Sequence, residues 1–479
     1  MSNHIIHKVT VDVNTASEKE AYFIKDNISR FLQDQIFPRI EKLFEEYDSG
    51  KILRVDILDL ELAIKDWKNT NEVVSKLEKE LLKCLNNPDS HLSKSTGSDQ
   101  ASIQIHVRNN AASIFLYFLE HGYLPWYGKK EDVIQFTHPD KWEKNLEEQS
   151  FAKKIGLLLQ KDGHAVKRFV YQLSTNNILS FIDSLGVLNV SGKKILITFV
   201  DKLSNNFRSV FLSYFISKTV NTESENSFFD FSEFYSSLGI SGNEKEHLSI
   251  IHEFNTVIEK AFLKNIGGRI RFNPKDKTLK NSLLQKTSDI VLRANFEEID
   301  RKGEVAHPFL KQDNDEIFVN NAGLILIHPF LKSYFENLAF LDKEGAIKEE
   351  SRFVALHAFH FLVTGKDEYF ESDMILEKFL CGIPLEIPIP TYSLINEYIK
   401  TEAEILLKEV IKHWPALKST SPDGLRQMFF YRDGKLQKTD KGYKLTVECK
   451  AQDVLLDQLQ WGISIVKLPW QKELLYVEW

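Results

Sequence analysis

The chain has 479 residues, with 61 lysines and arginines against 68 aspartates and glutamates, which gives a formal net charge of -7. Its 43% hydrophobic and 27% charged residues are globular proportions and argue against an intrinsically disordered chain. At this length a single hydrophobic core stops growing, so several domains are expected. The charge is mildly acidic and evenly mixed, without a basic block, which argues against nucleic acid as a partner.

The amino-terminal sequence MSNHIIHKVTVDVNT lacks a basic segment followed by a continuous apolar run, so no signal peptide is expected. No uncharged apolar stretch of about 18 residues occurs, and therefore no membrane-spanning helix is expected. The cysteines, Cys84, Cys381 and Cys449, are too few and too widely spaced for a disulfide framework. These features predict a cytoplasmic protein with reduced thiols.

Residues 1–86 predict a small β-α-β-α domain. Apolar residues alternate from Ile6 to Val13, which predicts a half-buried strand. Ser17 and Glu20 have the spacing of a capping box that opens a helix, and Pro38 is expected to kink or restart that helix.

The second half of this domain predicts another strand and helix. Residues 53–64 alternate, but the apolar phase shifts by one position, which predicts a bulge near Ile57. Residues 73–85 have the spacing of a closing helix.

Polar, serine-rich sequence at residues 87–102 predicts a flexible linker and the clearest domain boundary of the chain. Residues 103–300 then predict a mostly helical middle region, with helices at 111–122, 166–173 and 250–265.

Residues 301–479 predict a mixed carboxy-terminal domain. Residues 317–319 and 324–327 are short buried strands or the start of a helix, and residues 352–364 and 402–414 are helices, the first of them buried. Asp433 and Gly434 are expected to form the turn of a β-hairpin, and a second turn at residues 439–442 completes a small β-meander. The fold class predicted for the whole chain is therefore α+β, helix-rich and multidomain.

The sequence contains no complete catalytic motif among those considered, which are a phosphate-binding loop and a metal site. The glycine-rich stretch at residues 186–194 has the wrong spacing for a phosphate-binding loop. His357 and His360 share one helix face and are the best candidates for a metal site, but zinc needs at least one more ligand and their neighbours are apolar. No catalytic, cofactor-binding or metal-binding residue is therefore predicted. The alternative that stays open is a metal-dependent hydrolase centred on His357 and His360.

The triplet Leu468-Pro469-Trp470 and the final residue Trp479 are candidates for a docking surface. A tryptophan next to a proline is a rigid anchor with a large apolar area and little backbone entropy left to lose. Anchors of this kind are enriched at protein interfaces, while core packing is the alternative role.

Several stretches together resemble the tape measure family of extracellular contractile injection systems of the antifeeding-prophage type. They are residues 6–64, 118–126, 322–331, 355–365, 376–384, 410–430 and 453–479. The resemblance covers both ends of the chain and one central stretch.

The resemblance implies a non-enzymatic component of a phage-tail-like particle, with the inner tube, the baseplate or a cargo as partners, and without catalytic residues. It also implies a protein that is cytoplasmic during assembly or is carried within a released particle. A tape that sets tube length by its own extent would be extended, whereas this sequence predicts turns and compact domains. A length-setting tape and a compact assembly or cargo-loading factor both stay open.

Overall fold

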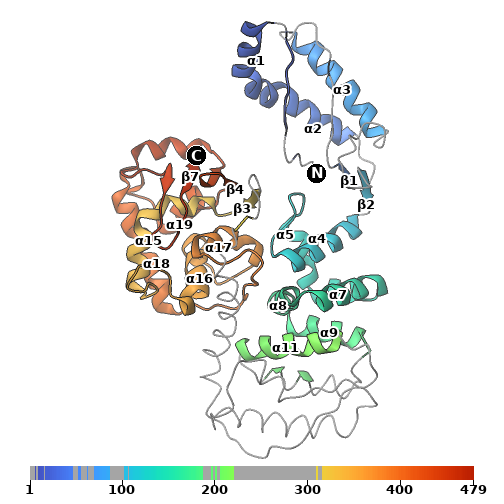
Figure 1. Cartoon of the computed structure of the whole chain (residues 1–479), viewed down its shortest axis with the longest axis vertical. Coiled ribbons are helices and arrows are strands. Elements are labelled where there is room, and N and C mark those ends of the chain that lie inside the picture. Colours follow the sequence, from blue (N-terminus) through green and yellow to red (C-terminus); the bar gives the residue numbers. More distant parts are fainter. Residues whose placement is uncertain are drawn as a thin grey trace, which may run out of the picture. The chain divides into compact units, whose positions relative to one another are not determined.

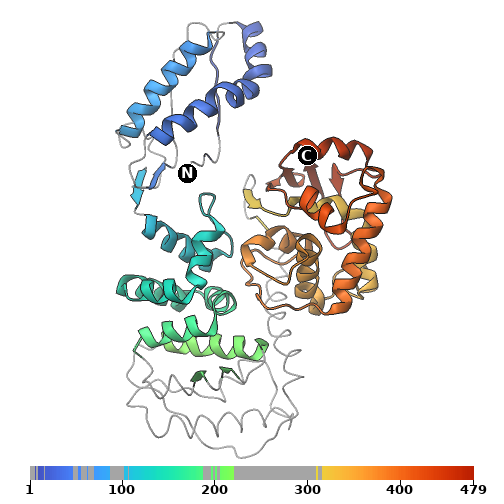
Figure 2. The same ribbon diagram turned by 180° about the vertical axis from the view of Figure 1, so that it is seen from behind.

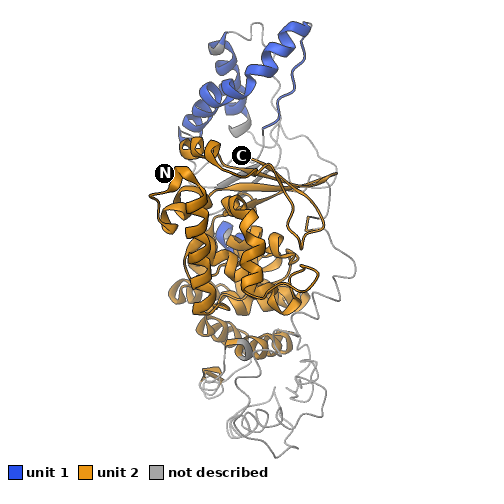
Figure 3. Ribbon diagram, turned by 90° about the vertical axis from the view of Figure 1, so that its left-hand side faces the viewer, with its two compact units in different colours: residues 1–114 blue, residues 115–479 orange. Residues whose placement is uncertain are grey.

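The computed structural model of the chain describes two compact units, residues 1–114 and residues 115–479 (Figure 3). Within them, the described residues are 6, 9–15, 17–46, 52–55, 62, 69–86, 102–105, 107–186, 196–197, 200–201, 205–220, 309–310 and 316–479. The two units are described separately below.

In its described residues unit 1 consists of helices and one pair of short strands (Figure 1). Its elements are α1 (Glu18–Phe31), a π-helical turn (Leu32–Ile36), α2 (Phe37–Glu46), β1 (Ile52–Val55), α3 (Thr70–Asn86) and β2 (Ser102–Ile105), followed by the start of α4 (Val107–His121). Apolar side chains of α3, including Val73 and Leu77, pack with Ile36 in one small core.

α1 begins at the predicted place, but only the Ser17 half of the predicted capping box forms, and the helix changes near Pro38. The Ser17 hydroxyl accepts a hydrogen bond from the Glu20 backbone N–H at 3.4 Å, while the Glu20 carboxylate accepts one from the Thr15 hydroxyl at 3.0 Å. The π-helical turn ends at Ile36, two residues before Pro38. This is expected because a proline has no N–H to donate and its ring crowds the carbonyl four residues earlier.

The predicted first strand is wrong in the part of it that is described. Ile6 and residues 9–15 carry no strand, and the side chains of Val9, Val11 and Val13 are 42–45% exposed. Alternating apolar residues form a strand only when the backbone finds a neighbour to bond. In the described part of the chain β1 pairs instead with β2, antiparallel from Ile52 opposite Ile105.

β2 was not predicted, and it begins at Ser102, the last residue of the predicted linker. Residues 56–61, where the bulge near Ile57 was expected, and residues 87–101 of the linker lie outside the described residues. The predicted helix at residues 250–265 also lies outside them.

Unit 2 begins with helices packed in succession (Figures 1 and 2). After the end of α4 they are α5 (Lys130–Ile134), a 3-10 turn (Gln135–Thr137), α6 (Pro139–Leu146), α7 (Gln149–Lys161), α8 (Gly163–Gln172), α9 (Thr175–Ser184) and α11 (Asn205–Val220). Aromatic rings fill this region. Phe136 stacks on Phe115 with ring centroids 4.7 Å apart, and the buried Trp142 indole donates to the Asn177 carbonyl at 2.8 Å.

The rest of unit 2 combines helices with a five-stranded sheet. The first elements are β3 (Glu316–Val319), a 3-10 helix (Ala322–Ile327), α15 (His328–Asn337), a 3-10 turn (Glu349–Ser351), α16 (Arg352–Thr364), a 3-10 turn (Glu371–Met374), α17 (Ile375–Cys381) and α18 (Glu397–His413). They are followed by a 3-10 turn (Pro415–Leu417), α19 (Pro422–Leu425), a π-helical turn (Arg426–Phe430), β4 (Gly434–Thr439), β5 (Gly442–Val447), a 3-10 helix (Ala451–Gln458), β6 (Ile465–Val466) and β7 (Leu475–Glu478).

The helix-rich α+β fold class is confirmed, and α16 occupies the predicted residues. Among the described residues, no helix has both the length and the apolar content needed to cross a membrane. The sheet has the order β3-β4-β5-β7-β6, in which β5 and β7 are parallel and the other pairs antiparallel.

The predicted hairpin around Asp433 and Gly434 is wrong. Gly434 is the first residue of β4, and the segment before it is helical rather than extended. A side chain at Gly434 would place its Cβ 2.5 Å from the Cβ of Ala322, so this glycine is required by close packing and not by a turn. The hairpin lies one strand later, between β4 and β5, where the predicted turn at residues 439–442 ends at Gly442 with φ of 134°.

Gly323 offers a test of the packing between the segment before α15 and the segment before β4. An added Cβ would lie 1.8 Å from the Phe429 carbonyl oxygen, and that backbone cannot move without disturbing the buried Phe429 and Phe430. We expect Gly323→Ala to lower the free energy of unfolding by roughly 2–4 kcal/mol in urea titrations. Gly462→Ala is the matched control, since no atom lies within 4 Å of its added Cβ. A Gly323→Ala protein as stable as this control would show that the two segments are not tightly packed.

Candidate functional site

Three fully buried charged side chains lie where the helical region of unit 2 meets the sheet-containing region. They are Arg168 on α8, Glu371 in the 3-10 turn before α17, and Lys378 on α17, each with 0% side-chain exposure. One Glu371 oxygen accepts from Arg168 Nε at 3.0 Å, and the other accepts from Lys378 Nζ at 2.6 Å. We call these three residues the buried charge cluster.

The two cations also bind backbone carbonyls of segments distant in sequence. Arg168 donates to the carbonyls of Leu119 and Glu120 at the end of α4, and to that of Glu386 at 2.7 Å. Lys378 donates to the carbonyls of Leu385 at 2.9 Å and Ile387 at 2.7 Å. Buried donors left without acceptors are costly, so this full set of acceptors is what makes two buried cations tolerable.

Gly122 makes room for this arrangement. It follows α4 with φ of 81°, a conformation that favours glycine, and an added Cβ would lie 2.5 Å from Glu371 Oε1 and 2.7 Å from Arg168 Nη2. The cluster therefore depends on a residue without a side chain at the end of α4.

Burial changes the protonation of Lys378. Desolvation lowers its pKa to about 8, with the Glu371 charge opposing and the Arg168 charge adding to the shift. The cluster carries two cations and one anion when all three groups are charged, so loss of the Lys378 proton brings it to neutrality.

His357 and His360 do not form a metal centre with other described residues. The His360 ring nitrogen Nδ1 lies 3.1 Å from Glu377 Oε1, which also accepts from the Asn321 side chain at 2.8 Å. His357 Nδ1 accepts from the Leu394 backbone N–H at 3.4 Å. Both rings are buried, at 0% and 3% exposure. Among the residues that the structure describes, no three His, Cys, Asp or Glu side chains are grouped as metal ligands.

The environment of His357 keeps it neutral. Burial, with a smaller contribution from the nearby His360, lowers its pKa to about 3, and its ring stacks on Tyr369 with centroids 4.0 Å apart. The geometry is that of a packed core histidine, and the hydrolase alternative gains no support from it.

The predicted docking residues lie against the core of unit 2. Leu468 is buried, and the half-buried Trp470 stacks on Phe335 at 5.0 Å and donates its indole N–H to the Leu380 carbonyl at 2.8 Å. The Trp479 indole donates to Asp453 Oδ2 at 3.0 Å, and Pro469 is exposed. The side chains of Leu468, Trp470 and Trp479 serve contacts within the chain, and a docking role for the four residues stays a prediction.

The buried charge cluster was not predicted from the sequence, although the neighbours of Arg168 carried a signal. Ala165 and Phe169 on the same face of α8 are apolar, which favours a buried face, and the structure buries both of them. No local sequence pattern identifies Glu371 as the partner of Arg168, because the two residues lie 203 positions apart in the sequence.

The comparisons with known proteins identify one family. A family model described as contractile injection system tape measure protein matches residues 3–479. No significant match was found among curated proteins or among solved structures.

Removing the negative charge of the cluster should be costly. We expect Glu371→Gln to lower the free energy of unfolding by about 3–5 kcal/mol, because Arg168 and Lys378 would then be two buried cations without a counter-charge. The control Glu336→Gln removes an exposed carboxylate 3.7 Å from Lys332 and should cost less than about 0.5 kcal/mol. Equal losses in chemical denaturation would contradict a structural role for the cluster.

The lowered pKa of Lys378 predicts how the free energy of unfolding depends on pH. Its pKa is lowered from 10.5 to about 8 in the folded protein, so between these values the unfolded chain binds the additional proton. Stability contributed by this group is therefore present above pH 10.5 and lost as the pH falls through about 8. We expect the wild type to gain stability relative to Lys378→Met as the pH rises from 8 to 10.5. Urea titrations across this range measure the difference, and a constant difference would contradict the lowered pKa.

Proposed function

Because the chain belongs to the contractile injection system tape measure protein family, we propose that it is a non-enzymatic assembly factor of the particle and does not measure the tube by its own length. In this role unit 2 works as a folded body that engages other subunits. Tube length would then be set through those contacts or by other components.

The observation that carries this proposal is the buried charge cluster. It joins Arg168 to Glu371, 203 positions apart, through side chains that are fully buried. A contact of this range holds distant parts of the chain within a few ångströms, which an extended tape cannot do. The parallel pairing of β5 with β7 adds a second non-local constraint.

The dimensions involved differ greatly. A single helix with the length of unit 2 would span roughly 550 Å at about 1.5 Å per residue. A compact body of the same length has a radius of gyration of about 21 Å. The contour of the folded unit therefore cannot match a tube much longer than the unit itself.

The partners that fit this role are protein subunits of the particle: the inner tube, the baseplate or a cargo. We place the protein in the cytoplasm during assembly, or within the released particle if it leaves with a cargo. The mildly acidic, mixed charge of the chain supports protein partners over nucleic acid.

An insertion distinguishes the proposed role from a literal tape. We expect a 28-residue helical insert after the exposed Gly186, where α9 has ended, to leave tube length in electron micrographs unchanged. A tape would lengthen the tube by about 42 Å. Deleting the whole protein should instead lower the number of particles or their cargo content, or scatter the tube lengths.

The same insert placed between Asp440 and Lys441, in the turn from β4 to β5, controls for local disturbance. Variants are compared only when their melting matches that of the wild type. Tube length that increases with the insert at both positions would overturn the proposal.

A further inference from the structure

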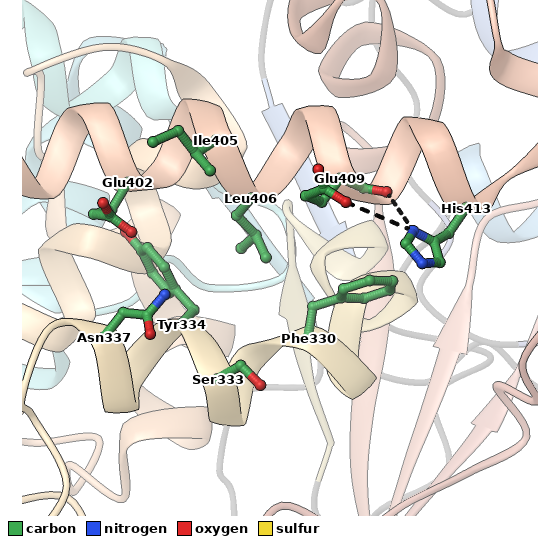
Figure 4. Close-up of a pocket in the computed structure, with 9 residues that line it drawn as sticks. All are labelled: Phe330, Ser333, Tyr334, Asn337, Glu402, Ile405, Leu406, Glu409 and His413. Atoms are coloured by element: carbon green, nitrogen blue, oxygen red, sulfur yellow. Dashed lines mark hydrogen bonds and ion pairs between the residues drawn. The ribbon is translucent and has the colours of Figure 1, made fainter.

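A groove of about 270 Å³ lies between α15 and α18 (Figure 4). Its lining includes Phe330 and Tyr334 from α15, and Ile405 and Leu406 from α18. Figure 4 shows Phe330 and Leu406 directed into the space between the two helices. The groove lies within unit 2 and is separate from the buried charge cluster.

The apolar side chains along the groove are incompletely covered. Ile405 is 48% exposed, and Leu406 and Phe330, which also line the groove, are half-buried. Tyr398, 55% exposed, precedes Ile405 by seven residues and so continues the same face of α18. Single exposed apolar residues are common, but several incompletely covered apolar side chains beside a groove are typical of a binding surface.

The charges of the groove are acidic. Two of its lining residues, Glu402 and Glu409, are carboxylates, and none is a lysine or arginine. Glu409 is paired with Lys412 at 3.4 Å and with His413 at 4.0 Å, and all three side chains are about half exposed or more, so these pairs are weak. Glu402 is half-buried and has no ion pair with any described residue. A cation from outside the chain would complement it.

A second polar group in the groove lacks a partner. Tyr334 is 2% exposed, and its hydroxyl is buried without a hydrogen bond in the described part of the chain. Burial raises the pKa of Tyr334, and the charge of Glu402 raises it further. The buried hydroxyl is out of reach of a partner and gives the Glu402 carboxylate no hydrogen bond in the described part of the chain, so Glu402 is the group that a partner can complement.

We infer that this groove binds an amphipathic helix of a partner protein, with apolar side chains packed against Phe330, Ile405 and Leu406 and a lysine or arginine paired with Glu402. From Glu402 to His413 the groove follows α18 for about 17 Å, or three helical turns. A third helix packs naturally along the furrow between two others. The inference rests on the proposed assembly role only in taking the partner to be another protein of the particle.

Binding of a designed peptide to the full chain tests the inference. The probe is a fluorescent 18-residue helical peptide with leucines at positions i, i+4, i+7 and i+11 and lysines flanking them. We expect saturable binding by fluorescence anisotropy that weakens as salt is raised, and no binding of a peptide with glutamates in place of the lysines. Binding should fall more than tenfold in Ile405→Asp and about fivefold or more in Glu402→Gln.

Ile465→Asp is the matched control, because Ile465 is 59% exposed on β6, outside the groove, and binding should be unchanged. Ile405→Ser replaces the aspartate variant if its melting differs from that of the wild type. Equal binding by the Ile405 and Ile465 variants, or by the glutamate peptide, would overturn the inference. So would a dimer in sedimentation that Ile405→Asp dissociates, since the occupant would then be a second copy. These outcomes are independent of tube length, which tests the assembly role.

Discussion

The arrangement of unit 2 depends on the buried ion pairs of Glu371 with Arg168 and Lys378. Replacing a buried ion pair by well-packed apolar residues is often neutral or stabilising, so such charges are weak evidence for stability. We infer that what they supply here is specificity. An apolar contact tolerates sliding, whereas Arg168 and Lys378 have acceptors only when the end of α4 and the carbonyls of residues 385–387 are in place. The cluster thus fixes how the helical region meets the sheet-containing region.

The end of the chain completes the same unit. β7 pairs in parallel with β5, so the chain must cross over before it can join the sheet, and it returns through the segment that contains Trp461 and Trp470. Each indole donates to a backbone carbonyl at 2.8 Å, that of Leu326 for Trp461 and that of Leu380 for Trp470. These bonds attach the return segment to the helical side of the core. The segment from Trp461 to Trp470 is therefore held to the rest of unit 2 at two points.

The sequence revealed elements whose signal is local and unambiguous. Residues 352–364 are apolar almost all round, which only a buried helix satisfies, and α16 spans those residues. The wrong prediction of a turn at Asp433-Gly434 shows what a local pattern cannot distinguish. A glycine required for a turn and a glycine required for close packing, as Gly434 is against Ala322, look alike in a sequence. β2 and the pairing of β5 with β7 are non-local, and no local pattern specifies a strand's partner. Arg168 was not singled out in the sequence, although Ala165 and Phe169 on the same face of α8 are apolar and favour a buried face.

The same limit applies to finding a binding surface. Tryptophans, above all those that follow a proline, are natural candidates for a binding surface in a sequence because they are rigid and bury a large area. The same properties also favour packing within the chain, and Trp470 stacks on Phe335. Side chains left over for partners are identified only after the core is known. Ile405 and Glu402 are ordinary residues of a helix. They become notable because the packing of α15 against α18 leaves Ile405 48% exposed and leaves Glu402 without an ion pair among the described residues. Because Trp470 packs against the core, exposed side chains such as Ile405 are a further place to look for a surface that binds other subunits.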